Sequence, residues 1–196
     1  QIQSLPINSG VFCLKKDRFQ DVVWIGTDGQ GVYLYSNPLY SIKSMVLSNY
    51  TEKIERPVRA IYLDDECTFW VGTKGNGILK IYDYEFDKNI SDCRAEVLTT
   101  SNSALSSNAV YCFAKSHRNL LWIGDEEGLT YYSYREKRIK SIPIRIGNED
   151  FKYIHDIYET ADSELWLASV GMGVVKARIA GTPDNPVIVD AQRYII

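Results

Sequence analysis

Apolar and polar positions alternate in short runs that recur along the chain in a fixed order. Each run holds a Trp, a β-branched residue or Leu and a small residue, and a Gly-containing turn and a second apolar run follow it. The runs begin at Trp24, Trp70, Trp122 and Trp166, which are all the tryptophans of the chain and lie 46, 52 and 44 residues apart. A repeat of this length is typical of an array of small sheets, and a β-propeller is the leading interpretation.

Each copy is expected to form a strand, a tight turn and a second strand, because the alternation suits a pleated segment. Asp28-Gly29 is a strong hairpin signal, since Gly tolerates positive φ. The residue two after each Trp shares its face and is small, which leaves room for a neighbouring sheet. These small residues are Gly26, Gly72, Gly124 and Ala168, and the glycines that close the turns are Gly31, Gly77, Gly128 and Gly173. The third turn is one residue shorter and acidic, so its hairpin should differ.

Another apolar run begins 12 or 13 residues before each Trp, at Val11, Val58, Val110 and Ile154. With a further strand after each hairpin, every copy holds four short strands, as a propeller blade does. The sequence therefore predicts an all-β propeller segment with four blades of four antiparallel strands, which either close on themselves or form an arc of a larger propeller. We expect one segment over residues 1–196. Its blades are predicted near 10–48, 57–99, 109–146 and 153–196, with 1–9 as the tail of a preceding blade and 139–146 as the last strand of the third blade.

The composition and net charge of the chain limit the classes of molecule that it is expected to bind. The chain has 196 residues, 45% hydrophobic and 24% charged, with a formal net charge of −3, which is ordinary for a soluble globular protein. The absence of a basic stripe argues against nucleic acid as a partner. No apolar run approaches the roughly 20 residues that span a bilayer, so no membrane contact is expected from this segment. Because the chain opens with Gln1 rather than Met, we expect it to be a piece of a longer protein.

Side chains that carry catalysis form no recognisable motif. The cysteines have neither CxxC pairing nor zinc spacing, so Cys13 and Cys112 are interpreted as core residues, while a Cys67–Cys93 disulfide stays open. His117 is expected to be a solvated loop residue, and neither it nor His155 lies in a metal-binding motif. No nucleophile elbow is present. The sequence predicts no catalytic residue, no metal and no cofactor.

One position of the first strands is a candidate for ligand binding. Phe12, Arg59, Tyr111 and His155 occupy the same slot of the four copies, and first strands border the central channel of a propeller. The loops before these strands and the hairpin tips after the Trp strands should meet there; Glu126 and Met172 belong to this group. The alternative is a plain solvated rim. The candidate ligand-binding residues are Asp28, Gln30, Arg56, Arg59, Lys74, Asn76, Tyr111, Lys152, Tyr153 and His155.

The segments Val58-x-x-Ile61-x-x-Asp64, Trp70-Val71-Gly72-Thr73 and Gly77-Ile78 resemble the two-component regulator propeller repeat. The other copies depart from it in part: Ser116 and Thr160 stand where Asp64 does, and Ala168 stands where Gly is usual. The resemblance implies the periplasmic sensor region of a membrane-bound hybrid histidine kinase that detects oligosaccharide breakdown products. The membrane helix, kinase, receiver and DNA-binding regulator of such a receptor would lie elsewhere in the parent chain.

Three functions follow from these observations. The first is a non-catalytic, periplasmic sensing module with an oligosaccharide ligand. The second is a protein-interaction or dimerisation scaffold, because an arc of four blades leaves edge strands that invite pairing, including with a second copy of the chain. The third, ranked last, is a propeller-type glycan-active enzyme. Glycoside hydrolysis normally needs two facing carboxylates, and the sequence singles out no such pair.

Overall fold

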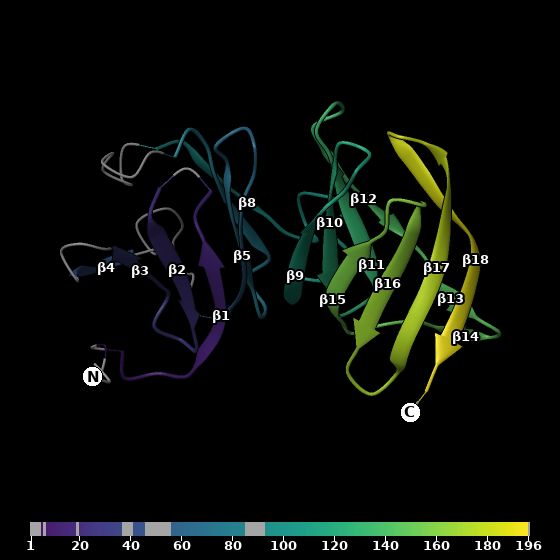
Figure 1. The fold of residues 1–196 in the computed structure, drawn as a ribbon, viewed down its shortest axis with the longest axis horizontal. Coiled ribbons are helices and arrows are strands. Elements are labelled where there is room, and N and C mark those ends of the chain that lie inside the picture. The colour runs from purple at the N-terminus through teal and green to yellow at the C-terminus, as the bar shows by residue number, and fades with distance from the viewer. Residues whose placement is uncertain are drawn as a thin grey trace. The chain divides into compact units, whose positions relative to one another are not determined.

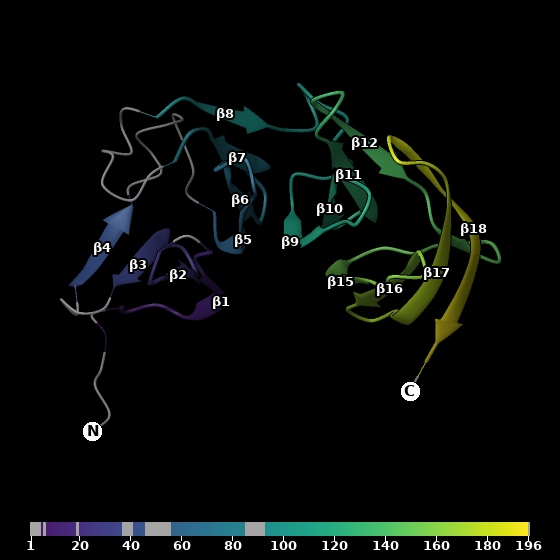
Figure 2. The ribbon, with the colours of Figure 1, turned by 45° about the horizontal axis from the view of Figure 1, so that its top comes forward.

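The computed structural model describes residues 5, 7–18, 20–36, 41–45, 56–84 and 93–195. These residues form strands and turns and no helix, which confirms the predicted all-β class. Among them, four antiparallel sheets of four strands each follow the order of the chain, as blades of a propeller do (Figures 1 and 2).

Each sheet is a meander in which consecutive strands pair. The first sheet contains β1 (Val11–Lys16), β2 (Val22–Thr27), β3 (Val32–Ser36) and β4 (Ser41–Met45). The second contains β5 (Val58–Leu63), β6 (Phe69–Thr73), β7 (Ile78–Ile81) and β8 (Ala95–Leu98). The third contains β9 (Val110–Lys115), β10 (Leu120–Asp125), β11 (Leu129–Ser133) and β12 (Arg138–Ile142). The fourth contains β15 (Ile154–Glu159), β16 (Glu164–Ser169), β17 (Gly173–Thr182) and β18 (Asn185–Tyr194).

The chain divides into two compact units, Gln1–Val97 (unit 1) and Leu98–Ile196 (unit 2). Within unit 1 the first strands β1 and β5 are neighbours, and within unit 2 the first strands β9 and β15 are neighbours. The interpretation of residues 1–196 as one segment, and as an arc of a larger propeller, stays a prediction. Most of the predicted tail at 1–9 lies outside the described residues.

The predicted last strand of the third blade, at 139–146, is wrong in its second half. Strand β12 ends at Ile142, because Pro143 has no N–H for a ladder bond. The chain then forms a separate hairpin from β13 (Arg145–Ile146) and β14 (Glu149–Asp150), and its turn holds Gly147 at φ 62°.

The third Trp hairpin differs from the others, as its shorter turn predicted. In the second sheet the Thr73 N–H donates to the Gly77 carbonyl at 3.0 Å, which closes a five-residue turn. In the third sheet the Asp125 N–H donates to the Gly128 carbonyl at 3.0 Å, so that the turn has four residues.

Asp125 organises this shorter hairpin through its buried carboxylate. The carboxylate accepts the N–H groups of Glu127 (2.9 Å) and Gly128 (3.0 Å) and the hydroxyls of Thr130 (2.9 Å) and Ser106 (2.6 Å). Burial raises the pKa of the Asp125 carboxyl, and the four hydrogen bonds oppose that rise only in part.

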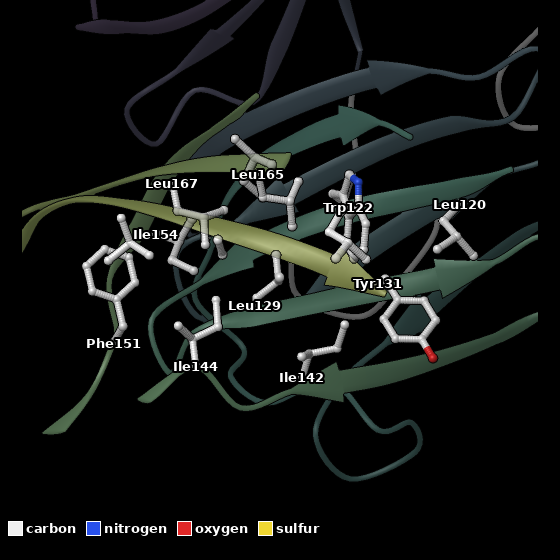
Figure 3. Packing of buried hydrophobic residues seen from close by; sticks show 14 residues of the cluster. Leu120, Trp122, Leu129, Tyr131, Ile142, Ile144, Phe151, Ile154, Leu165 and Leu167 are labelled. Carbon is white, nitrogen blue, oxygen red and sulfur yellow. The ribbon is translucent and has the colours of Figure 1, made fainter. Parts of the chain in front are cut away.

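Each unit has its own apolar core. In unit 1 the Trp24 ring lies 4.5 Å from the Phe69 ring and 5.2 Å from the Tyr84 ring, measured between centroids. The larger core of unit 2 is shown in Figure 3 and contains Leu120, Trp122, Leu129, Tyr131, Ile142, Ile144, Phe151, Ile154, Leu165 and Leu167. The first three tryptophans of the repeat are buried, whereas Trp166 is half-buried and stacks on Tyr194 at 5.8 Å.

A buried indole N–H needs an acceptor, and in unit 1 each sheet supplies its own. Trp24 Nε1 donates to Asp17 Oδ2 at 3.0 Å, and Trp70 Nε1 donates to Asp64 Oδ2 at 2.9 Å. Both aspartates follow the first strand of the same sheet and are buried themselves. The Asp of the repeat is therefore the hydrogen-bond partner of its Trp.

The third sheet has Ser116 at this position, and its acceptor comes from the fourth sheet instead. Trp122 Nε1 donates to Glu159 Oε2 at 2.7 Å, and the His117 N–H donates to the same oxygen at 3.2 Å. Glu159 lies on β15, so the carboxylate links two neighbouring sheets of unit 2. His117 is exposed, as predicted.

At Gly26 and Gly124 the small residue two after the Trp allows the neighbouring sheet to approach closely, as the sequence predicted. A Cβ on Gly124 would lie 2.5 Å from Cys112 Sγ and 2.6 Å from the backbone oxygen of Ile154. A Cβ on Gly26 would meet Cys13 Sγ at 2.5 Å and Val58 Cγ1 at 3.1 Å. A methyl group does not fit at either position without displacement of the neighbouring sheet.

Candidate functional site

The first strand of every sheet carries a β-bulge near its beginning. The ladder shifts register between Val11 and Cys13, and it shifts at the equivalent points of the other three first strands. The extra residues of the four bulges are Phe12, Arg59, Tyr111 and His155. Bulges redirect side chains and are common beside functional sites. The shared slot predicted from the sequence is thus a shared irregularity of the backbone.

The loops before the first strands and the hairpin tips after the Trp strands meet, as expected. In all four sheets a backbone N–H of the hairpin tip donates to a carbonyl just before the first strand. The four bonds join Asp28 to Gly10 (2.9 Å), Lys74 to Pro57 (2.9 Å), Glu126 to Ala109 (3.0 Å) and Val170 to Tyr153 (3.2 Å). We call the bulged residues together with these loops and tips the rim of each unit.

The described part of the unit 1 rim contains one aromatic ring of the bulges, that of Phe12, and the cations Arg56, Arg59 and Lys74. The guanidinium of Arg59 lies over the ring of Phe12, with Cζ 3.8 Å from the ring centroid. Phe12 is 41% exposed, and Arg59 is half-buried. Arg59 Nε is buried and donates to no acceptor within the described part of the chain.

Arg56 and Asn76 lie side by side in the same rim. The Arg56 N–H donates to Asn76 Oδ1 at 3.2 Å, and the Arg56 side chain packs along Gly75. Lys74 precedes Gly75 and is exposed. The remaining candidates of unit 1, Asp28 and Gln30, lie on the exposed tip between β2 and β3, where Gln30 Oε1 accepts the Tyr33 hydroxyl at 3.3 Å.

The rim of unit 2 contains a ring stack. The Tyr111 and His155 rings lie 4.1 Å apart between centroids, with 19° between their planes. One side chain comes from β9 and the other from β15, so the bulges of two neighbouring sheets bring them together. His155 is exposed and Tyr111 is half-buried.

Lys152 contacts the hairpin tips of both four-stranded sheets of unit 2. Lys152 Nζ donates to Glu127 Oε2 at 2.5 Å, and this carboxylate raises the pKa of Lys152. The Lys152 N–H lies 3.3 Å from Met172 Sδ, and the Lys152 carbonyl accepts the Ser169 hydroxyl at 2.5 Å.

Tyr153 has a left-handed backbone, with φ at 55°. Non-glycine residues rarely adopt this conformation, and such strain gathers at functional sites. Its N–H donates to the Glu126 carbonyl at 3.0 Å, and its carbonyl accepts the Val170 N–H at 3.2 Å. These two bonds hold the residue in place and leave its ring 42% exposed at the rim.

The two cysteines beside the bulges are partly buried and pack against the apolar cores. Burial raises the pKa of Cys13 to about 11 and raises that of Cys112 further. None of the four cysteines, all of which are described, forms a disulfide, so the Cys67–Cys93 alternative is wrong.

The described residues show no grouping of three or more His, Cys, Asp or Glu side chains that would hold a metal ion. Nor does any helix among them have the length and apolar character to cross a membrane.

The sequence did not single out Glu127 as a partner of Lys152 or Phe12 as a partner of Arg59. Both contacts join residues that are far apart in the sequence, at 2.5 Å and 3.8 Å respectively. The slot shared by Phe12 and Arg59 was the one signal that pointed to the second contact.

No protein-family model matches the chain. Among curated proteins it is 29% identical over 140 residues to translation initiation factor 6 of Saccharolobus solfataricus. That alignment covers 65% of this chain and 57% of the relative. The chain thus spans little more than half the length of this relative.

Solved structures are similar over nearly the whole chain. An extracellular domain assigned to a hybrid two-component system of B. thetaiotaomicron has a TM-score of 0.69 at 23% identity; the match covers 100% of this chain and 24% of that domain. A second extracellular domain of this organism, assigned to a one-component system, has a TM-score of 0.58 at 14% identity, covering 99% and 38%. PorZ, a surface component of the type-IX secretion system of Porphyromonas gingivalis, has a TM-score of 0.65 at 13% identity, covering 94% and 27%. The chain shares the fold of these proteins and spans about a quarter to two fifths of their length.

Proposed function

We propose that this chain is part of the periplasmic sensor region of a two-component receptor and that its ligand is an oligosaccharide. The observation that carries the proposal is the bulge repeated in all four first strands, which places two aromatic rings, a guanidinium and an imidazole at the rims. Aromatic faces beside polar donors suit a sugar, which has both apolar and hydroxyl surfaces. The fold shared with an extracellular domain assigned to a hybrid two-component system supports the sensor role, although fold alone does not determine function.

In this proposal the segment binds and does not catalyse, and the parent chain is a membrane-anchored histidine kinase. A role in translation, as the name of the archaeal relative would suggest, has less support. That match covers 57% of the relative, and the chain has a net charge of −3, whereas binding to nucleic acid favours a basic surface.

Thermal-shift screening of the chain against neutral and acidic oligosaccharides tests the proposal. A ligand that binds only the folded state raises the melting temperature by mass action. Tyr111→Ala removes one ring of the stack and should abolish the shift given by a ligand of the unit 2 rim. Tyr158→Ala is the matched control, because Tyr158 is 67% exposed and lies on β15 beyond the bulge. A broad panel without any shift would overturn the proposal.

A scaffold role is the second candidate, and strand β18 favours it. β18 is the last strand of its sheet and is ten residues long, with Val187, Val189 and Tyr194 between 41% and 52% exposed. Long exposed edge strands with apolar side chains invite pairing with another chain. Light scattering at increasing concentration distinguishes the roles, since a strict monomer would contradict self-association.

A further inference from the structure

The unit 1 rim holds a guanidinium that makes no hydrogen bond to the described residues. The Arg59 guanidinium lies over the Phe12 ring, with Cζ 3.8 Å from the ring centroid, and this contact restricts its position. Its buried Nε finds no acceptor, and no other hydrogen bond or ion pair from this side chain to a described residue is present. Buried donors in native proteins nearly always have a partner, so an orphaned one calls for an explanation.

Two further cations, Arg56 and Lys74, lie in the loops around the start of the Arg59 strand, and no carboxylate of the described residues compensates them. Val58, which precedes Arg59, pairs with Thr73 in the antiparallel ladder. Arg56 lies two residues before Val58 and Lys74 directly follows Thr73, so both lie at the same end of this ladder. The Lys74 N–H donates to Pro57, and the Arg56 side chain packs on Gly75, so the three cations share one loop cluster. None of the described carboxylates lies within ion-pair distance of any of them.

The equivalent positions of unit 2 carry no unbalanced positive charge. Lys152 stands where Arg56 does in the loop before the first strand, and Glu127 neutralises it at 2.5 Å. Glu126 stands where Lys74 does at the hairpin tip, with the same backbone bond to the preceding loop. The cationic character therefore belongs to the second sheet, since the first sheet has Asp28 in the slot of Lys74, and not to the blade architecture.

We propose that the unit 1 rim is a subsite for the acidic group of a saccharide, with Arg59 as the binding residue and Arg56 and Lys74 as flanking charges. This inference rests on the proposed function. A guanidinium presents a planar fork of donors that matches the oxygens of a carboxylate or a sulfate ester. The exposed Phe12 ring lies beside this fork and provides an apolar surface for the sugar.

Isothermal titration of the whole chain tests the subsite with tetragalacturonate as the acidic probe and galactotetraose as the neutral one. Tetragalacturonate should bind, and added salt should weaken it. Loss of a charge-assisted hydrogen bond in Arg59→Gln should weaken binding about tenfold or more. Arg59→Lys keeps the charge without the planar fork, so its affinity for tetragalacturonate should lie between those of the parent and Arg59→Gln.

Lys16→Gln is the matched control, because it removes the same charge at the far end of β1 from Phe12 and should leave binding unchanged. Since Arg59 makes no hydrogen bond to the described chain, Arg59→Gln should stay folded, with at most a small fall in melting temperature from the lost contact with Phe12. Equal affinity of the parent and Arg59→Gln for tetragalacturonate would overturn the subsite. Inorganic sulfate that binds as tightly as tetragalacturonate would overturn the saccharide assignment. Binding of galactotetraose alone would overturn the subsite and leave the sensor proposal standing, whereas binding of neither sugar nor any other glycan would overturn both.

Discussion

The indole of Trp122 depends on a carboxylate from the neighbouring sheet, and this dependence can be tested by moving the carboxylate. Glu159→Met keeps the length of the side chain and removes the acceptor that lies 2.7 Å from Trp122 Nε1. The Trp122 side chain is 0% exposed and Glu159 is 7% exposed, so water cannot easily replace the lost partner.

The expected cost follows from this burial. A buried donor left without an acceptor costs about 1–3 kcal/mol, and a charged acceptor places the loss in the middle of that range, about 2 kcal/mol. The His117 N–H also loses its 3.2 Å bond to Glu159, but this residue is exposed and water can take over. The free energy of unfolding should therefore fall by about 2 kcal/mol.

Ser116→Asp should reverse this loss, because it restores the acceptor that Asp64 provides for Trp70 at 2.9 Å in the second sheet. In the parent chain the same substitution should destabilise, since two carboxylates would then compete for one indole and repel each other. Urea unfolding followed by Trp fluorescence measures all four variants of the double-mutant cycle, and hydrogen exchange of the β10 amides assigns the change to unit 2. If Ser116→Asp destabilises both backgrounds equally, the argument is refuted.

Three other outcomes are expected. Gly124→Ala should lower the free energy of unfolding by about 1–3 kcal/mol, because the new Cβ meets Cys112 Sγ at 2.5 Å and the Ile154 oxygen at 2.6 Å; an unchanged urea midpoint would contradict this packing. Cys13 and Cys112 should react with a disulfide reagent at mildly alkaline pH only after unfolding, since burial raises the pKa of Cys13 to about 11 and that of Cys112 further. Mass spectrometry of labelled peptides measures the extent of reaction, and rapid labelling of either cysteine in the folded protein would contradict the prediction. Asp125 has a folded-state pKa above its ordinary value of 3.8, so the folded state binds its proton more tightly and should gain stability as pH falls from the raised pKa toward 3.8. Asp125→Asn should not gain stability as the pH falls through this range. Parallel pH profiles of melting temperature for the parent and Asp125→Asn would refute the prediction.

Local chemistry was sufficient to predict the strands and hairpins. The Trp24 and Trp70 copies alternate with period two, and Gly closes the turns, so each element is determined by neighbours in the sequence. The shorter turn at Asp125 was likewise recognisable from a missing residue. Pro143 also indicates a strand end, because it has no N–H for the ladder, and the strand predicted over 139–146 was therefore too long.

Contacts between distant residues needed the tertiary structure. The sequence placed Phe12, Arg59, Tyr111 and His155 in one slot, but a bulge is defined by the register of the partner strand, which alternation does not reveal. The same holds for Glu159: Ser116 left Trp122 without its usual acceptor, and only the packing of β15 beside β10 showed where the replacement comes from. Turns and alternation are local, so the pairing of neighbouring segments could be predicted from the residues alone. Which side chains of different sheets meet depends on how the sheets stack within each unit, and this is visible only in the folded chain.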